Sequence, residues 1–556
     1  MRASNGGRGD GMTRKIPAWL RLGLALSGVC YTMLLMQTPS HISFAVTAAL
    51  SLAVLLGLMF RSGLPEQLLS RRSPGVCVVA AVLSLSAVYT AKSTFFTTCW
   101  RWMDKLMTAL GLPEVLMRLI PWAVALAAVP MAFVCFLWFV DLMRELGKKL
   151  WTSSDFTERL FVLAAGILFG MMILFTHVCT QAFYGAHLNG SWYNFDLIYS
   201  ADSGYLMNQD VFRNVGAEQN DLRQPLFGLF AMPFAQTAWL LSRILFFLPN
   251  CYVTIWQIIQ MLLFLVAVVL LSRMMELQKA EKALFLVLCS VTYPVLIFVL
   301  TTEQYLVEMF YLMLLLYLGQ EERGKKLSFV AATGCMLTSG AWFPLVTWDR
   351  DFRKFVKKTL TLLGVFVAFT VLSGRLTTFL DIPTYIEGYV PYTGVTVSAV
   401  SKLKQFVNFA GACLIAPKSG VDTTSYHHIS WQMLPVTGWS PAGLIVLALS
   451  VCSMIVGWKK THVRRCAFWI GFSLLLLGIV GWGTVDNGLM LYTLYFGWAF
   501  ISLIFLLLER ILSRVRPLKL VLMTGMALAM AICNIYALRN VLIFATQFFP
   551  ALGGIR

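Results

Sequence analysis

The chain has 556 residues, of which 58% are hydrophobic and only 13% are charged, and its net charge is +18 at pH 7. Soluble domains carry about 25% charged residues, so this composition excludes an ordinary soluble enzyme. A basic chain can also bind nucleic acid, but here the basic residues lie in short segments between apolar runs, and we expect no nucleic-acid partner. The sequence predicts an all-α polytopic membrane protein.

Apolar runs that can cross a hydrocarbon core of about 30 Å as helices recur along the whole chain. The first run follows a basic leader and resembles a signal peptide. No small-residue cleavage site is convincing and further spans follow, so we interpret it as an uncleaved anchor. Thirteen transmembrane helices are expected, near residues 17–37, 43–60, 75–91, 121–142, 160–180, 252–272, 283–300, 303–319, 356–373, 441–458, 466–484, 488–508 and 518–540.

Two further apolar segments receive a different interpretation, because a span at either would reverse the loops that follow. Residues 223–248 predict a helix that lies on the outer interface and is broken at Pro225 and Pro233. Residues 327–348 predict a re-entrant segment of two half-helices covered by protein. The residues that interrupt this second run are Gly334, Gly340 and Pro344.

The positive-inside rule sets the expected orientation. With the N-terminus inside, most of the 44 basic residues fall in cytoplasmic connections, and two long loops lie outside. The expected regions are an N-terminal membrane region of four helices (1–150), a core (151–373) that holds the first outer loop (181–251), a second outer loop (374–440) and C-terminal membrane helices (441–556).

The first outer loop is locally acidic although the protein is basic. Its acids are Asp196, Asp202, Asp210, Glu218 and Asp221, and over the same part of the loop, up to Arg223, the basic residues are Arg213 and Arg223. Ordinary turn and cap acids would explain part of this pattern, since Asp202-Ser203-Gly204 has turn chemistry and Asp210 can cap a short helix. The acids could also hold a divalent cation through oxygen ligands. The functional alternative is a site that uses the carboxylates themselves.

Short motifs in and after this loop follow a recognisable order. Asp202-Ser-Gly-Tyr205 is followed by Arg223-Gln-Pro-Leu226, and then by Tyr293-Pro294, Thr301-Thr-Glu303 and the broken segment GCMLTSGAWFP. Over residues 160–345 this order resembles the C-type (GT-C) superfamily of integral membrane glycosyltransferases. The resemblance is to the polyprenyl-phosphate-sugar-dependent class, which includes protein mannosyltransferases and lipid A aminoarabinose transferases. In this chain a serine replaces the second acid of the family's acidic motif, and a glutamine replaces the first proline of its basic motif.

The resemblance implies a sugar transfer in which an acceptor hydroxyl attacks the anomeric carbon of a lipid-phosphate sugar. One carboxylate must take the hydroxyl proton, and a cation must steady the departing phosphate. We assign Asp202 as the base, with Asp196, nearer the preceding span, as the second catalytic candidate. Arg223 is the expected phosphate contact, because guanidinium matches phosphate oxygens; a lipid head-group anchor is the alternative. Tyr205 and Asp221 complete the substrate-binding set of this loop.

Other candidates lie further along the chain. Glu303 and Glu308 open a predicted span, and a charge inside the bilayer costs a few kcal/mol, which makes such acids functional candidates. Glu303 is the one we expect to line the site, and an acid favoured by the helix dipole is its alternative. The adjacent histidines of the second outer loop are a poor metal pair, since neighbours rarely converge on one ion. A donor-phosphate patch is expected in that loop from Arg375, Lys402, Lys404 and His427.

These observations predict an inverting glycosyltransferase of the cytoplasmic membrane with the C-type fold and an active site on the outer face. Its partners would be a polyprenyl-phosphate-linked sugar donor, membrane lipid, and an acceptor glycan, glycolipid or protein. The alternatives are a flippase or transporter for a lipid-linked saccharide, and an oligosaccharide polymerase or ligase. A transporter should carry charged residues near mid-bilayer and often inverted repeats, whereas the polar residues here cluster in the outer loops.

Overall fold

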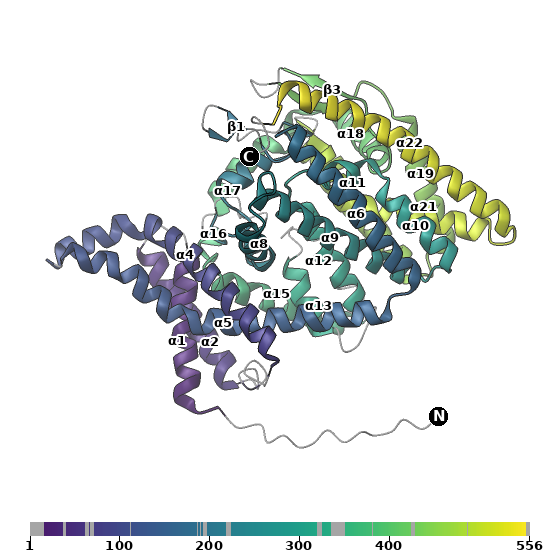
Figure 1. The fold of residues 1–556 in the computed structure, drawn as a ribbon. Coiled ribbons are helices and arrows are strands. Elements are labelled where there is room, and N and C mark those ends of the chain that lie inside the picture. The colour runs from purple at the N-terminus through teal and green to yellow at the C-terminus, as the bar shows by residue number, and fades with distance from the viewer. Residues whose placement is uncertain are drawn as a thin grey trace, which may run out of the picture. The chain divides into compact units, whose positions relative to one another are not determined.

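A computed structural model describes residues 16–36, 41–61, 66, 72–111, 113–185, 187–188, 191–192, 197–217, 224–319, 325–334, 351–380, 382–423, 429–485 and 488–551. Helices make up most of the described chain (Figure 1). The α-helices are α1 (Ala18–Leu35), α2 (His41–Arg61), α4 (Pro74–Ala109), α5 (Glu114–Ser153), α6 (Phe156–Cys179), α7 (Ser203–Asn208), α8 (Phe227–Ile244), α9 (Cys251–Met274), α10 (Lys279–Ser290), α11 (Tyr293–Phe298), α12 (Tyr305–Leu318), α13 (Lys325–Gly334), α15 (Phe352–Leu372), α16 (Thr377–Leu380), α17 (Ile382–Tyr389), α18 (Ala399–Ala412), α19 (Pro441–Gly457), α20 (Thr461–Ser473), α21 (Thr493–Ile511) and α22 (Arg516–Phe548).

Shorter elements connect these helices. The 3-10 helices are η2 (Val390–Tyr392), η3 (Gly394–Thr396) and η5 (Gly488–Tyr492), and the π-helix is η4 (Leu474–Val480). The strands form two antiparallel pairs, β1 (His187–Leu188) with β2 (Ser191–Trp192), and β3 (Ser419–Asp422) with β4 (Ser430–Met433).

Within the described residues, 10 helical segments are long and apolar enough to cross a membrane, so the chain is a multi-pass membrane protein. Two other expected spans form shorter apolar helices, α12 of 14 residues and α19 of 17 residues. The segment expected as one span at 283–300 is divided between α10 and α11. Pro294 lies in the first turn of α11 and cannot continue the hydrogen bonds of α10. The count of thirteen spans stays a prediction.

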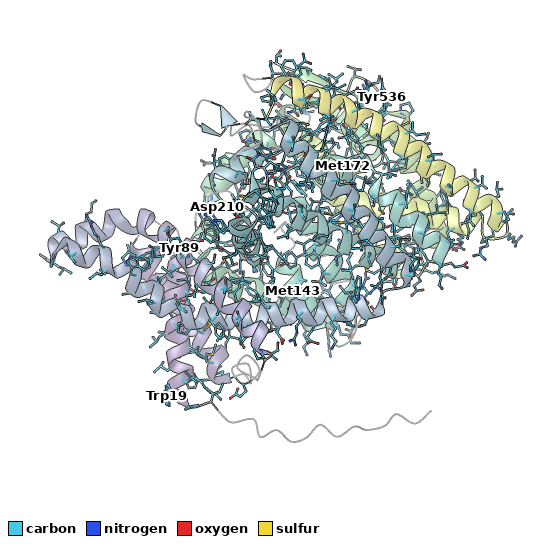
Figure 2. All side chains as sticks on the ribbon, in the orientation of Figure 1. Trp19, Tyr89, Met143, Met172, Asp210 and Tyr536 are labelled. Carbon is cyan, nitrogen blue, oxygen red and sulfur yellow. The ribbon has the colours of Figure 1, made fainter. Side chains whose placement is uncertain are left out.

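Large apolar side chains stand on the outward faces of several of these helices. Trp19, Tyr89 and Tyr536 keep 73%, 55% and 62% of their surface exposed (Figure 2). Soluble proteins rarely expose large contiguous apolar patches. These faces are therefore suited to contact with lipid.

The chain divides into two compact units, the first of which comprises residues 1–149 and 371–376. It contains α1, α2, α4 and most of α5. Gly28 lets α1 approach α2 closely, since a Cβ at this position would lie 2.6 Å from Leu55 Cδ1. The small core of this unit consists of Leu24, Ala25, Leu55, Met59, Met131 and Val134.

The second unit comprises residues 150–370 and 377–556, and its core is built on α9, α12 and α21. α12 packs along α9 and against α21, and nearly all of its residues are buried. A helix that is apolar on all sides must be enclosed by other helices. This enclosure explains how a helix of only 14 residues is held at the centre of the unit.

The segment expected to lie on the outer interface forms one continuous helix, α8. The predicted break at Pro225 agrees with the helix start at Phe227, whereas the predicted break at Pro233 is wrong, because the helix runs through this residue. Pro233 cannot donate a backbone hydrogen bond to the carbonyl one turn earlier, and the burial of half of the helix against the rest of the unit offsets this loss. α13 covers the first part of the expected re-entrant segment, and the remainder lies outside the described residues.

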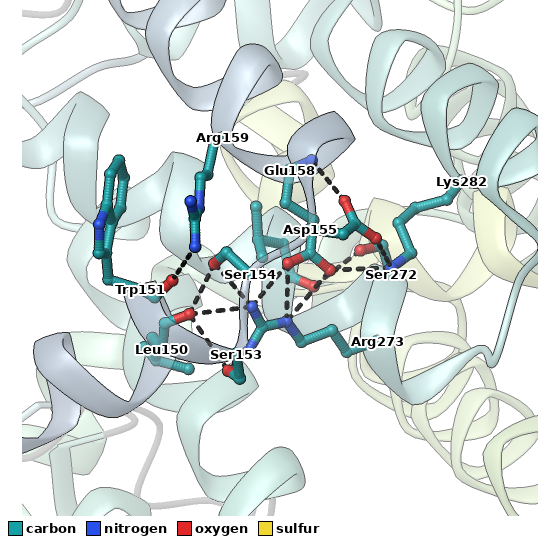
Figure 3. Close-up of polar contacts among 11 residues, drawn as sticks. Leu150, Trp151, Ser153, Ser154, Asp155, Glu158, Arg159, Ser272, Arg273 and Lys282 are labelled. Carbon is teal, nitrogen blue, oxygen red and sulfur yellow. Dashed lines mark hydrogen bonds and ion pairs between the residues drawn. The ribbon is translucent and has the colours of Figure 1, made fainter.

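One end of the second unit, which we call the ionic end, is held by ion pairs (Figure 3). Arg273 at the C-terminus of α9 donates to both carboxylate oxygens of Glu158 in the first turn of α6, with Nε to Oε1 at 3.1 Å and Nη2 to Oε2 at 2.6 Å. Lys282 of α10 donates to Glu158 Oε1 at 3.0 Å and to Asp155 Oδ2 at 2.7 Å. These bonds tie the start of α6 to the end of α9 and the start of α10.

The opposite end, which we call the loop end, is where α6 and α22 finish and where α9 and α12 begin. Thr180, just after α6, donates its hydroxyl to Phe549 O, just after α22, at 2.7 Å. At the ionic end the start of α22 meets the start of α10, because Lys519 pairs with Glu281 and both side chains are buried. The two ends of the bundle are therefore defined by separate sets of contacts.

Candidate functional site

The candidate residues of the loop end gather around a short turn that precedes α7. Tyr199 N–H donates to Trp431 O, and Trp431 N–H donates to Leu197 O, both at 2.8 Å. Tyr199 and Ser200 then adopt left-handed backbone conformations, with φ of 53° and 58°. Two consecutive non-glycine residues in this region store strain, which persists only where the surrounding structure holds it. The turn ends where α7 begins.

The Tyr199 side chain anchors this turn in a buried hydrogen-bond network. Its hydroxyl lies 2.5 Å from the Tyr293 hydroxyl, donates to Ser419 Oγ at 2.9 Å and accepts from Trp431 Nε1 at 3.1 Å. Burial raises the pKa of the Tyr199 phenol, so the group stays neutral at physiological pH. Contacts from α11 and from the strands β3 and β4 thus hold this turn in place.

Asp202 follows this turn and contacts Glu303 from the segment before α12. The Asp202 backbone N–H donates to Glu303 Oε1 at 2.6 Å, and the Gln304 backbone N–H donates to Glu303 Oε2 at 3.2 Å. Glu303 is buried, and its own carbonyl accepts a hydrogen bond from the Gln260 side chain of α9. Asp202 is half-buried and occupies the N-cap position of α7, but its carboxylate makes no capping hydrogen bond.

Close contacts fix α7 against the ends of α6 and α12. A Cβ at Gly185, whose φ is +88°, would lie 2.3 Å from Gly204 Cα, so only glycine fits there. Thr302 N–H donates to Phe183 O at 3.0 Å. The Gln257 amide of α9 donates to Thr302 Oγ1, also at 3.0 Å. The backbone that carries Asp202 and Glu303 is thus held from several helices.

A third acid, Glu308, lies in the first turn of α12. Its side chain is fully buried, and within the described part of the chain neither carboxylate oxygen has a hydrogen-bond partner. It lies close enough to Glu303 for the two carboxyl groups to interact electrostatically. The Tyr305 phenol interacts with the carboxylates of Asp202, Glu303 and Glu308. We call these four residues the acidic site.

Asp210 has a different environment from Asp202 although both belong to the same acidic loop. Its carboxylate pairs with Arg213, with Nη2 to Oδ2 at 2.5 Å. The Arg213 guanidinium lies 5.2 Å from the ring centroids of both Trp239 and Tyr252. Asp210 therefore anchors the loop to α8 and α9 through Arg213 rather than belonging to the acidic site. Tyr205 lies half-buried on α7.

The two lysines of the expected phosphate patch are engaged with backbone carbonyls. Lys402 Nζ donates to Ile479 O at 3.3 Å and Val480 O at 3.2 Å, at the end of the π-helix. Lys404 Nζ donates to Thr437 O at 3.3 Å. Both contacts are compatible with a purely structural role, and the patch stays a prediction. Arg375 is a buried member of the first unit.

Several predicted site residues lie outside the described residues, namely Asp196, Asp221, Arg223 and His427. The described part of the chain contains no group of three or more His, Cys, Asp or Glu residues that could hold a metal ion. Glu303 and Asp202 are the predicted site residues that the structure brings into direct contact.

Sequence reasoning missed the neutral residues that support the acidic site. Gln257 and Gln260 stand three residues apart within an apolar run, and that spacing places them on one face of a helix. A polar pair on one face of a membrane helix is a usable signal. Trp431 carries no such signal, because its partner Tyr199 is more than two hundred residues away.

Comparison of the chain with protein-family models, with curated proteins and with solved structures finds no match. The functional interpretation therefore depends on the residues of this chain and on their geometry.

Proposed function

We propose that the protein is an inverting membrane glycosyltransferase that moves a sugar from a polyprenyl-phosphate donor to an acceptor on the outer face of the cytoplasmic membrane. The observation that carries the proposal is the acidic site, in which the partly exposed Asp202 contacts the buried Glu303 through its backbone N–H, and Glu308 is buried in the first turn of the following helix. Glu308 is buried with no hydrogen-bond partner for its carboxylate among the described residues. Such an acid is costly, so it is a feature of sites where the charge serves a function.

In the proposed reaction Asp202 acts as the general base. The acceptor hydroxyl oxygen forms a bond to the anomeric carbon, the bond from that carbon to the phosphate oxygen breaks, and the hydroxyl proton passes to Asp202. Polyprenyl phosphate leaves with the electron pair of the broken bond. The strained turn at Tyr199 and Ser200 and the Glu303 contact hold the backbone of Asp202 in one position, which supports this role.

The donor phosphate is assigned to Arg223 and its neighbours. Arg223 precedes the segment of α8 in the sequence, and its guanidinium would offer a fork to phosphate oxygens. Asp221 and Tyr205 would contact the sugar, with Asp196 as the second catalytic candidate. Lys402, Lys404, Arg375 and His427 remain candidates for further donor contacts.

The distribution of basic residues supports the proposed orientation of the protein in the membrane. Basic residues concentrate in the connections at the ionic end, where Arg273, Lys282 and Lys519 lie, and cytoplasmic loops are enriched in such residues. The loop end with the acidic site would then face outward.

A second candidate function is transport of a lipid-linked saccharide. Glu308 favours it, because a buried acid without a hydrogen-bond partner among the described residues is typical of ion and proton pathways. A transporter would move its substrate without breaking a glycosidic bond, which separates the two functions in an assay.

The test is sugar transfer by the purified protein in detergent, supplied with defined polyprenyl-phosphate sugars. We expect release of polyprenyl phosphate, and a fall of about 10²-fold or more in rate for Asp202→Asn, which keeps the shape of the residue but accepts no proton. Asp210→Asn is the matched control, since that acid pairs with Arg213 outside the acidic site. No product with any donor, or equal rates for both variants, would contradict the proposal.

A further inference from the structure

The turn between α19 and α20 concentrates positive charge at the ionic end of the second unit. It reads Trp-Lys-Lys-Thr-His-Val-Arg-Arg over residues 458–465. The chain contains no Asp or Glu between Asp422 and Asp486. Arg510 Nη1 donates to Val456 O at 2.6 Å, which fixes this turn beside the C-terminus of α21. The positive charge of the turn is therefore not balanced by acids from its own stretch of sequence.

The start of α20 lies within this basic turn. A helix N-terminus carries partial positive charge, so acids and other anions stabilise it and cations do not. The N-cap residue of α20 is Lys460, which provides no side-chain cap hydrogen bond. Serine, threonine, asparagine or aspartate would normally satisfy the first backbone N–H groups. The start of α20 thus combines cationic side chains with backbone donors that have no side-chain cap.

Buried polar groups without partners lie beside this helix start. His462 is only 7% exposed, and neither of its ring nitrogens has a hydrogen-bond partner among the residues that the structure describes. Within the same described ranges, Arg465 Nη1 and Trp498 Nε1 are buried without a partner as well. The His462 ring lies 6.2 Å from the Trp498 ring, and His462 interacts electrostatically with Arg465 and Lys460. A buried polar group that is left unpaired destabilises the fold, so these groups are suited to a bound acceptor.

We propose that this turn binds the phosphate group of an anionic membrane lipid, with His462, Arg465 and the start of α20 as its donors. A phosphate presents several acceptor oxygens, and it suits a guanidinium fork together with backbone N–H groups at a helix start. Trp458, which is 48% exposed, marks the adjoining surface as suited to the membrane interface. Basic pockets between membrane helices on the cytoplasmic side are known to suit lipid head groups. The inference is independent of the proposed sugar transfer.

The experiment measures lipid binding to the full-length purified protein by native mass spectrometry and by its melting temperature in neutral detergent. Phosphatidylglycerol is compared with phosphatidylcholine, and inorganic phosphate is the soluble probe. Arg465→Gln should weaken phosphatidylglycerol binding about tenfold, and Arg465→Lys should weaken it less, because a point charge attracts phosphate without the fork. Arg514→Gln is the matched control: it removes the same charge from an exposed residue in the connection between α21 and α22, and its binding should stay within about twofold of wild type.

The outcomes separate the sources of the phosphate. Preference for phosphatidylglycerol that is lost in Arg465→Gln supports the lipid site. Protection by inorganic phosphate without a preference for phosphatidylglycerol, lost in the same variant, would assign a soluble source and overturn the lipid site. Equal binding of both lipids by the wild type, or equal losses in Arg465→Gln and Arg514→Gln, would overturn the proposal. If Arg465→Gln fails to fold, Arg465→Lys decides by the same comparison.

Discussion

The two ends of the second unit differ in the partners of their buried acids. At the ionic end, Glu158 contacts both Arg273 and Lys282, and Glu281 contacts Lys519. At the loop end, the Glu303 carboxylate accepts hydrogen bonds from two backbone amides, and Glu308 has no hydrogen-bond partner within the described residues. Acids paired with cations hold helices together, whereas a buried acid such as Glu308, which has no hydrogen-bond partner among the described residues, weakens the fold and needs another reason to be present.

The largest effect is expected at the ionic end, from removal of one partner of a buried pair. Lys519→Met should destabilise the protein by about 3–5 kcal/mol, because Glu281 would stay buried without its counter-charge. Thermal unfolding of the purified protein measures the change.

The control is the double replacement Lys519→Met with Glu281→Leu. It removes both charges and should recover most of the lost stability, since apolar residues often replace a buried pair without loss. If the single and double variants unfold alike, the pair does not stabilise this end.

The same substitution applied to acids at both ends sharpens the comparison. Glu308→Met should stabilise the protein by about 1–3 kcal/mol, because it removes a buried polar group that has no hydrogen-bond partner among the described residues. Glu158→Met should instead destabilise it, since Arg273 and Lys282 would lose their partner. Melting temperatures at equal detergent concentration report both changes. A Glu308→Met variant that melts lower than wild type would refute this interpretation of the loop end.

A smaller effect is expected from Glu303→Gln. The amide oxygen still accepts a hydrogen bond from the Asp202 N–H, but the charge of the carboxylate is lost. We expect this weaker hydrogen bond to cost about 1 kcal/mol, which is about fivefold in rate. We expect the loss in kcat rather than in KM, because Glu303 acts by positioning Asp202. A rise in KM with unchanged kcat would place Glu303 in substrate binding instead.

The smallest effect is a pH dependence at Asp155. Burial disfavours its charged form, but hydrogen bonds from Lys282 and from the Glu158 N–H outweigh burial and lower the pKa of Asp155. Because its pKa is lower in the folded protein, the charged carboxylate stabilises the fold at pH values above the usual Asp pKa of about 3.9. This stabilisation is lost as the pH falls through the pKa of the folded state. Asp155→Asn keeps the N-cap of α6 and should cost a few tenths of a kcal/mol at pH 7.

Melting curves at pH 7 and near pH 3 test this sign. The difference between wild type and Asp155→Asn should shrink at the lower pH. A difference that grows on acidification would mean that Asp155 is not stabilised by Lys282.

The membrane helices could be predicted from the sequence, because each appears there as a run of apolar residues. α9 and α22 lie where runs near 252–272 and 518–540 predict them. Pro294 also marks the division between α10 and α11 in the sequence. Hydrophobicity averaged over residues 283–300 does not reveal this division. Local composition therefore gives the helices, and single residues decide where they break.

The acidic site was accessible only in part. Asp202 and Glu303 were both selected from the chain, yet their contact spans about a hundred residues and no periodicity connects them. The partners of Lys402 and Lys404 are backbone carbonyls, which have no side-chain signature in a sequence. Asp210 and Arg213, three residues apart, form a pair that spacing on a turn could have predicted.

The left-handed backbone at Tyr199 and Ser200 also limits which substitutions these two positions tolerate. Glycine, asparagine and aspartate enter that backbone region most readily, so most coding changes at either position would add strain. Replacement of Tyr199 would in addition break a network that reaches Tyr293 and Trp431. In descendants of this gene we expect position 200 to alternate among serine, glycine and asparagine, while position 199 keeps its tyrosine.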